Sequence, residues 1–227
     1  IRGPHEAITA LRSLNEDGPQ ATLERVADGR SGNITLGFSL EHYLAHAKAY
    51  IDGLNARVEA LKGLDRTDAE IGEDISKIHW VFSLFMSRID RKLNNVKGND
   101  LWFDQAIQQA QASGEPDKAQ VLRYLKGKTS IAVGRFTGQV MQYIFGLWDL
   151  LDDDGGFLST EQRNLIETLR QGFTRLRATY RAQPLYLLVA SSGRYSAEQP
   201  YATDLHYVLP FLGRGMWNTL PPDTLEA

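Results

Sequence analysis

The chain has 227 residues, of which 42% are hydrophobic and 23% are charged. These values are typical of a globular protein with a hydrophobic core, and they exclude an intrinsically disordered chain. The sequence contains no cysteine, which excludes disulfides, thiolate metal sites and a cysteine nucleophile. A net charge of -3 argues against a protein that binds nucleic acid through its overall charge.

The hydrophobic runs at 78–86 and 184–190 are far shorter than the ~20 residues that a membrane-spanning helix needs. We therefore expect a soluble protein without a transmembrane segment. No signal peptide pattern occurs, and the chain begins at Ile1 rather than Met, which indicates a processed product or a fragment. The sequence does not indicate the cellular compartment of the protein.

The first 36 residues carry two short helical signals, which follow Pro4 and Pro19 and are expected to form a small cap or arm. From Ser39 to Leu64 apolar residues recur at spacings of three and four, which predicts an amphipathic helix with Ser39 as its N-cap. Gly63 lies where this helix is expected to end.

A second long helix is expected over 67–95, because Thr67 and Glu70 form a capping box and an apolar stripe follows. Trp80 and Leu84 project from the side opposite this stripe, so this stretch is apolar nearly all round. We interpret it as the central helix of a bundle, packed antiparallel to the preceding helix.

The rest of the chain continues the helical pattern. Two shorter helices are expected before Gly127, and a second long hairpin is expected over 130–181. Ser159 with Gln162 forms a capping box at its second helix. Gly134 and Gly138 predict the close approach of a neighbouring helix, because glycine otherwise costs about 1 kcal/mol in a helix.

Residues 184–222 are rich in proline, glycine and aromatic residues, and 184–190 fits a short strand or one more helix. The sequence thus predicts an all-α fold, an antiparallel helical bundle of about six to eight helices in a single domain, 1–227. Its parts are short N-terminal helices at 1–36, a bundle core at 39–181 and an irregular aromatic segment at 184–227.

An acidic segment at 149–161 is the sharpest local motif. Asp152, Asp154 and Glu161 fall where an EF-hand loop places ligands, which suggests a divalent cation such as calcium. Leu150, however, occupies the position of the first carboxylate ligand. The alternative is a solvated acidic turn that caps the next helix.

His42 and His46 stand four residues apart on the first long helix, the spacing at which two imidazoles can share one metal ion. A surface or boundary histidine pair is the alternative interpretation. Asn33-Ile34-Thr35 matches a glycosylation sequon, whose meaning depends on the compartment.

Two groups of residues suggest a partner. Arg163, Arg170 and Arg177 line one side of the helix that follows the acidic segment, and they could meet an acidic partner or an anionic membrane surface. Tyr207 and Trp217 lie in the aromatic C-terminal segment, and such residues are common in interface hot spots. The alternatives are a solvated helix face and a cover over the core.

No complete catalytic constellation is visible, so the sequence favours a non-enzymatic binding or scaffolding domain that engages a protein partner or associates with itself. One alternative is a metal-dependent helical enzyme or sensor that uses the acidic segment or the histidine pair. Another is a peripheral membrane domain that binds anionic lipid through the arginine side chains.

Overall fold

The computed structural model describes residues 6–8, 17–94, 102–153, 156–193, 203 and 205–222. The chain divides into two units, each with its own internal contacts. Unit 1 comprises residues 1–84, 136–188 and 214–217, and unit 2 comprises residues 85–135, 189–213 and 218–227.

Five strands form one sheet in the order of the chain. They are β1 (Glu6–Ile8), β2 (Gly32–Gly37), β3 (Trp80–Phe85), β4 (Leu185–Ala190) and β5 (Met216–Asn218). β2 pairs in parallel with both β1 and β3. Helices separate the first four strands from one another, and the strand order does not reverse, which is the connection pattern of α/β barrels rather than of doubly wound sheets. The prediction of an all-α bundle was therefore wrong.

Helices occupy most of the remaining described chain. Unit 1 contains α2 (Asp17–Ala27), α3 (Leu40–Lys62), α4 (Asp68–Ile75) and α9 (Thr160–Tyr180). Unit 2 contains α5 (Met86–Asn94), α6 (Trp102–Ala112), α7 (Pro116–Leu125) and the 3₁₀ turn η1 (Leu209–Phe211), and α8 (Thr129–Ile144) has residues in both units.

The predicted helix starts are confirmed where a capping residue marks them. The Ser39 side chain accepts a hydrogen bond from the backbone N–H of His42 at the start of α3. Both capping boxes are present, Thr67 with Glu70 at α4 and Ser159 with Gln162 at α9. These short-range signals work because the hydrogen bonds that they encode join residues only three positions apart.

The expected helix over 67–95 is instead α4, then β3, then α5. Trp80, Phe82 and Leu84 are buried and so is Ser83, so this strand is covered on more than one side. A strand of a parallel sheet is apolar on both faces, and its sequence therefore lacks the alternation that marks a half-exposed strand. The same property made it resemble a buried helix.

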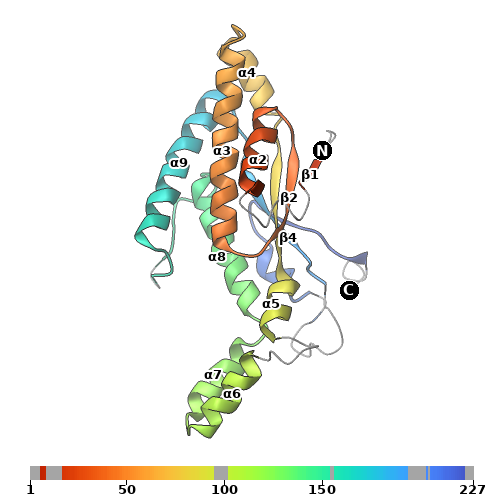
Figure 1. Cartoon of the computed structure of the whole chain (residues 1–227), viewed down its shortest axis with the longest axis vertical. Helices are drawn as coiled ribbons and strands as arrows, with labels where there is room; N and C mark the ends of the chain where they lie inside the picture. The colour runs from red at the N-terminus through yellow and green to blue at the C-terminus, as the bar shows by residue number, and fades with distance from the viewer. Residues whose placement is uncertain are drawn as a thin grey trace. The chain divides into compact units, whose positions relative to one another are not determined.

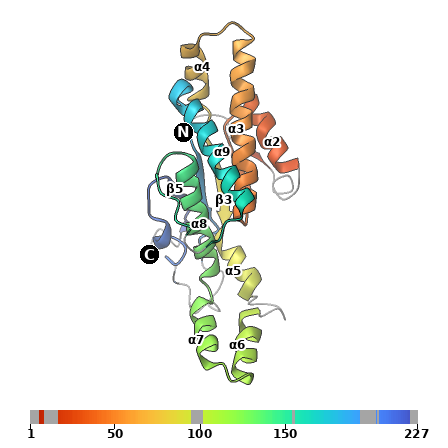
Figure 2. The ribbon, with the colours of Figure 1, turned by 90° about the vertical axis from the view of Figure 1, so that its left-hand side faces the viewer.

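Helix α3 lies against one face of the sheet. The rings of Tyr43 and Phe82 meet edge to face with centroids 5.3 Å apart, and the Tyr43 hydroxyl donates to the carbonyl of Leu185 in β4. Tyr50 likewise donates to the carbonyl of Gln183, just before that strand. In both views α2 and α9 run beside α3 (Figures 1 and 2). The main core of unit 1 therefore lies between α3 and the strands.

The C-terminal segment is partly regular. Residues 185–190 form the strand that was one of two predicted alternatives, and β5 and η1 lie in the stretch that was expected to be irregular. The two glycines of α8 do allow a close approach, but the groups that approach them are side chains and not the backbone of a neighbouring helix. A Cβ at Gly134 would lie 2.8 Å from Met86 and Phe211, and one at Gly138 would lie 2.8 Å from Met216.

Gly37 at the end of β2 gives a test of this packing. A Cβ at that position would lie 2.2 Å from the ring of Phe82, which is fully buried. We expect Gly37→Ala to lower the free energy of unfolding by about 1 to 3 kcal/mol, because the buried ring must move. Gly63→Ala is the matched control, since its Cβ would meet nothing nearer than 3.5 Å. Chemical denaturation measures both, and equal stability of the two variants would contradict the packing.

Candidate active site

The face of the sheet that points away from α3 carries a hollow of about 490 Å³. Side chains alternate along a strand, so the buried Leu185 and Leu187 of β4 point one way and Tyr186 and Leu188 point the other. Tyr186 also packs against Trp217 of β5, with ring centroids 5.9 Å apart. The hollow is lined by Gly32, Asn33, His79, Trp80, Val81, Gln183, Tyr186, Leu188 and Trp217.

A polar pair joins β2 and β3 on this face. Asn33 is in register with Val81, and both line the hollow. Ser83 stands two residues after Val81, so it shares that face, and its hydroxyl donates to Oδ1 of Asn33 at 2.7 Å. Ser83 is 2% exposed, whereas Asn33 is half-buried. The pair places hydrogen-bonding groups at a surface whose lining is mainly apolar and also includes His79 and Gln183.

Sequence reasoning did not select Asn33 or Ser83 as site residues. In the sequence Asn33 stands out only as part of a sequon, and Ser83 falls within the helix expected over 67–95. The signal that could have found them is a polar side chain within each of two buried strands, because such a group needs a hydrogen-bond partner or a ligand.

Unit 2 holds the residues that directly follow β3 and β4. The Ser87 and Ser191 hydroxyls are 2.8 Å apart, and the Ser87 N–H donates to the carbonyl of Ser191. The exposed Arg88 places its guanidinium over the ring of Phe85, 4.8 Å from the centroid. In α/β barrels the loops at the carboxyl ends of the strands build the active site, which makes this end of the strands chemically relevant.

Tyr207, a predicted partner contact, is fully buried in unit 2. Its hydroxyl donates to the carboxylate of Asp90, which also accepts from the backbone N–H and the hydroxyl of Ser130. Asp90 thereby holds the start of α8 and the C-terminal segment together. Trp217, the other predicted aromatic contact, is 43% exposed and lines the hollow on the sheet.

The three arginines of α9 make contacts within unit 1. Arg163 pairs with Asp153 at 2.6 Å, and Arg170 pairs with Asp149 at 2.8 Å. Arg177 donates to the carbonyl of Phe145 at 3.0 Å. Together they hold the segment that follows α8 against α9. A role in binding an acidic partner remains a prediction.

The acidic segment forms a turn that its own carboxylate stabilises. Asp153 accepts from the backbone N–H groups of Phe157 and Leu158. Asp152 is exposed, and Asp154 lies outside the described residues. Glu161 lies in the first turn of α9, and a hydrogen bond from the backbone N–H of that turn lowers the pKa of its carboxyl. Calcium binding by Asp152, Asp154 and Glu161 is untested and stays a prediction.

The histidine pair lies on α3 between the sheet and the surface. His46 is 1% exposed, its Nδ1 lies 2.9 Å from the hydroxyl of Thr22 in α2, and its ring lies against Phe82. His42 is half-buried, and its Nδ1 has no hydrogen-bond partner. In the part of the chain that the structure describes, no group of three His, Asp or Glu side chains could hold a metal ion. Metal binding by His42 and His46 remains a prediction.

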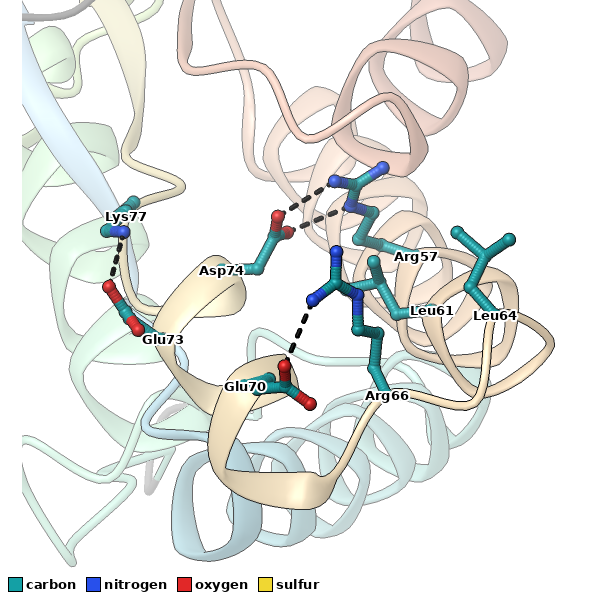
Figure 3. Close-up of a pocket in the computed structure, with 8 residues that line it drawn as sticks. All are labelled: Arg57, Leu61, Leu64, Arg66, Glu70, Glu73, Asp74 and Lys77. Atoms are coloured by element: carbon teal, nitrogen blue, oxygen red, sulfur yellow. Dashed lines mark hydrogen bonds and ion pairs between the residues drawn. The ribbon is translucent and has the colours of Figure 1, made fainter.

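A second hollow, of about 440 Å³, lies beside the turn that joins α3 to α4 (Figure 3). Arg57 donates two hydrogen bonds to the carboxylate of Asp74, at 2.9 and 2.8 Å. Arg66 pairs with Glu70, and Lys77 pairs with Glu73. Because each of these cations already has a carboxylate partner, we interpret the hollow as a clamp between two helices and not as a binding site.

Comparison with known proteins gives a consistent result. The chain is 32% identical to a transaldolase of Trichodesmium erythraeum, 31% to a transaldolase of an Arthrobacter species and 30% to transaldolase 2 of Nostoc punctiforme. Each match covers 93% of this chain but only 43%, 42% and 44% of the relative. The chain thus spans less than half the length of these curated relatives. No protein-family model matches it.

These relatives correct the functional prediction. A non-enzymatic scaffold was expected because no complete catalytic constellation was visible, yet the relatives are named for an enzyme. The parallel sheet removes the structural basis of that expectation, since the predicted scaffold was an all-α bundle. The predicted lack of a membrane span is confirmed for the described residues, among which no helix has the length and apolar character to cross a bilayer.

The Arg57–Asp74 pair gives the clamp a pH dependence. Hydrogen bonds from Arg57 lower the pKa of the Asp74 carboxyl in the folded protein. A lowered pKa stabilises the fold at pH values above the ordinary aspartate pKa of ~3.9, and this stabilisation is lost as the pH falls through the folded-state pKa. We expect Asp74→Asn to lower the free energy of unfolding by about 1 kcal/mol at pH 7 and by less below pH ~4.

Urea denaturation at pH 7 and pH 3 measures this effect. Glu73→Gln is the matched control, because it removes the Glu73–Lys77 pair at the edge of the same hollow, where both side chains are 69% exposed. A loss of stability for Asp74→Asn that is the same at both pH values would contradict the role of the ionised carboxylate.

Proposed function

We propose that this chain is part of a transaldolase, an enzyme that transfers an aldol fragment from one sugar to another. The observation that carries the proposal is the match, at about 30% identity over 93% of the chain, to several relatives of that name. The sheet supports it, because parallel strands in chain order with helices between them form a common scaffold for enzymes that act on small molecules.

The hollow on the sheet and the polar pair beside it suit a polyhydroxylated substrate. Ser83 uses its hydrogen to donate to Asn33, which leaves its oxygen able to accept from a sugar hydroxyl. The same bond fixes Asn33 so that its NH₂ group can donate to a hydroxyl or carbonyl oxygen. We assign to Asn33 and Ser83 the binding and orientation of the sugar.

Transfer of an aldol fragment also requires a group that activates the donor carbonyl, and a lysine amine can do this as a Schiff base. Among the described residues, the lysines lie on helices and turns, and none lies on a strand. We therefore assign to the described residues only the binding of the sugar, through Asn33 and Ser83.

A hybrid enzyme tests the proposal without requiring this chain to act alone. The matched segment of the Trichodesmium erythraeum transaldolase is replaced by this chain, and transfer of the fragment from a ketose donor to an aldehyde acceptor is followed by chromatography. We expect the hybrid to catalyse the transfer. A hybrid that folds, as judged by a cooperative thermal transition, and shows no transfer would contradict the proposed function.

Variants of the hybrid test the two site residues. Ser83→Ala and Asn33→Asp should each lower kcat/KM about 10- to 100-fold, because each removes hydrogen bonds to the sugar or the group that orients them. Asn33→Asp keeps an oxygen that accepts from Ser83 and removes the NH₂ donor. Ser76→Ala is the control, since Ser76 is half-buried at the end of α4, donates its hydroxyl hydrogen to the carbonyl of Glu73 and does not line the hollow. An active hybrid that is insensitive to both site changes would contradict the assigned roles.

A further inference from the structure

Asp90 is a fully buried carboxylate at the centre of a hydrogen-bond network in unit 2. One oxygen accepts from the backbone N–H of Ser130 at 3.0 Å, and the other accepts from the hydroxyls of Ser130 at 2.8 Å and of Tyr207 at 2.9 Å. Ser130 lies in the first turn of α8, where the positive end of the helix dipole favours a negative charge. A buried carboxylate is costly unless donors satisfy it, and these three bonds meet that need.

The network joins three segments that are far apart in the sequence. Asp90 lies in α5, Ser130 lies in α8, and Tyr207 belongs to the C-terminal segment. That segment also contacts the turn before α8, because Nε2 of His206 lies 2.8 Å from the carbonyl oxygen of Gly127. α5 has nine residues, a length at which a helix is marginal in water, so its position depends on contacts of this kind.

The side of α5 that carries Asp90 also carries Ser87. The two residues are three positions apart, which puts them on one face of the helix, and both are buried. The Ser87 N–H donates to the carbonyl of Ser191 at 3.1 Å, and the hydroxyls of these two serines lie 2.8 Å apart. The contacts that fix Asp90 therefore also fix Ser87 against the residue that follows β4.

Ser191 has a strained backbone conformation. Its φ is +53°, in the left-handed region that favours glycine. Such strain persists at other residues only where the surrounding structure determines it, and it is concentrated at functional sites. Ser191 directly follows β4, at the end of the strand where α/β barrels bind their substrates. The two contacts with Ser87 help to hold this conformation.

We infer that Asp90 is a positioning residue, which acts through the shared face of α5 to hold Ser87 and Ser191 in the arrangement that the reaction needs. Its effect on turnover rests on the proposed function, whereas its hold on the two serines does not. A group displaced near the reacting atoms slows the chemical step, so loss of the Asp90 contacts should lower kcat more than it raises KM.

Hydrogen exchange of the full chain tests the hold on the serines directly. The Ser87 N–H reports on its bond to Ser191, and we expect Asp90→Asn to speed its exchange at least tenfold. Tyr207→Phe is the milder variant, because it removes one of the three bonds to the carboxylate and should speed this exchange less. Ile107→Ala is the control, since it weakens the small core of the α6–α7 hairpin in the same unit and should leave the Ser87 N–H unchanged.

Kinetics of the hybrid enzyme test the effect on turnover, at a temperature below the thermal transition of every variant. We expect Asp90→Asn to lower kcat at least tenfold and to change KM less than threefold, and Tyr207→Phe to lower kcat by a smaller factor. Ile107→Ala should leave both constants unchanged, although it also lowers stability.

Unchanged exchange of the Ser87 N–H in Asp90→Asn would overturn the inference, whatever the activity of the hybrid. Faster exchange with an unchanged kcat, or an equal loss of kcat in Ile107→Ala, would overturn the effect on turnover. A hybrid that folds but is inactive with the wild-type chain would contradict the proposed function and with it the effect on turnover, and faster exchange would then still support the hold on the serines.

Discussion

The packing of one ring, that of Phe82, determines which side chains of β3 face α3 and which point to the opposite face of the sheet. Phe82 lies between β3 and α3, in edge contact with Tyr43, against His46 and close to Gly37. Because strand side chains alternate, a buried Phe82 obliges Val81 and Ser83 to point to the opposite face. The contact that holds α3 on the sheet thus also places the hydrogen-bonding group of β3 beside Asn33.

Several charged side chains in the described part of unit 1 join helices and loops. Arg57 joins α3 to α4, and Arg163, Arg170 and Arg177 fix the segment that follows α8. Such contacts explain why rows of arginine need not indicate a binding surface. The face with the hollow is different, because apolar area dominates its lining, and the polar side chains among the lining residues are those of Asn33, His79, Gln183 and Tyr186.

The sequence predicts structure well where the determinants are local. The caps at Ser39, Thr67 and Ser159 were found because each is a hydrogen bond over three residues. β3 was missed because a strand buried on both faces has no alternation, and the off-stripe positions of Trp80 and Leu84 were read as a fully buried helix. β2 was missed because its two glycines resemble turn residues, although they are needed where the rings of Trp80 and Phe82 approach.

The candidate site could not be predicted from the sequence, because its residues are far apart along the chain. Asn33 and Ser83 are 50 residues apart, and they meet only through the parallel register of β2 and β3. The motifs that local spacing does reveal, the acidic segment and the histidine pair, resemble metal sites because short carboxylate and imidazole spacings recur by chance. The register between two strands decides which distant residues meet, and no pattern of neighbouring residues in the sequence reveals that register.

We propose that the face of the sheet turned away from α3 binds the sugar. The most direct measurement is a crystal structure of the hybrid enzyme with a ketose bound. We expect the ketose oxygens to lie within hydrogen-bond distance of the Asn33 amide and the Ser83 hydroxyl. A ketose bound instead at the acidic segment, or between the helices around Arg57 and Asp74, would contradict it.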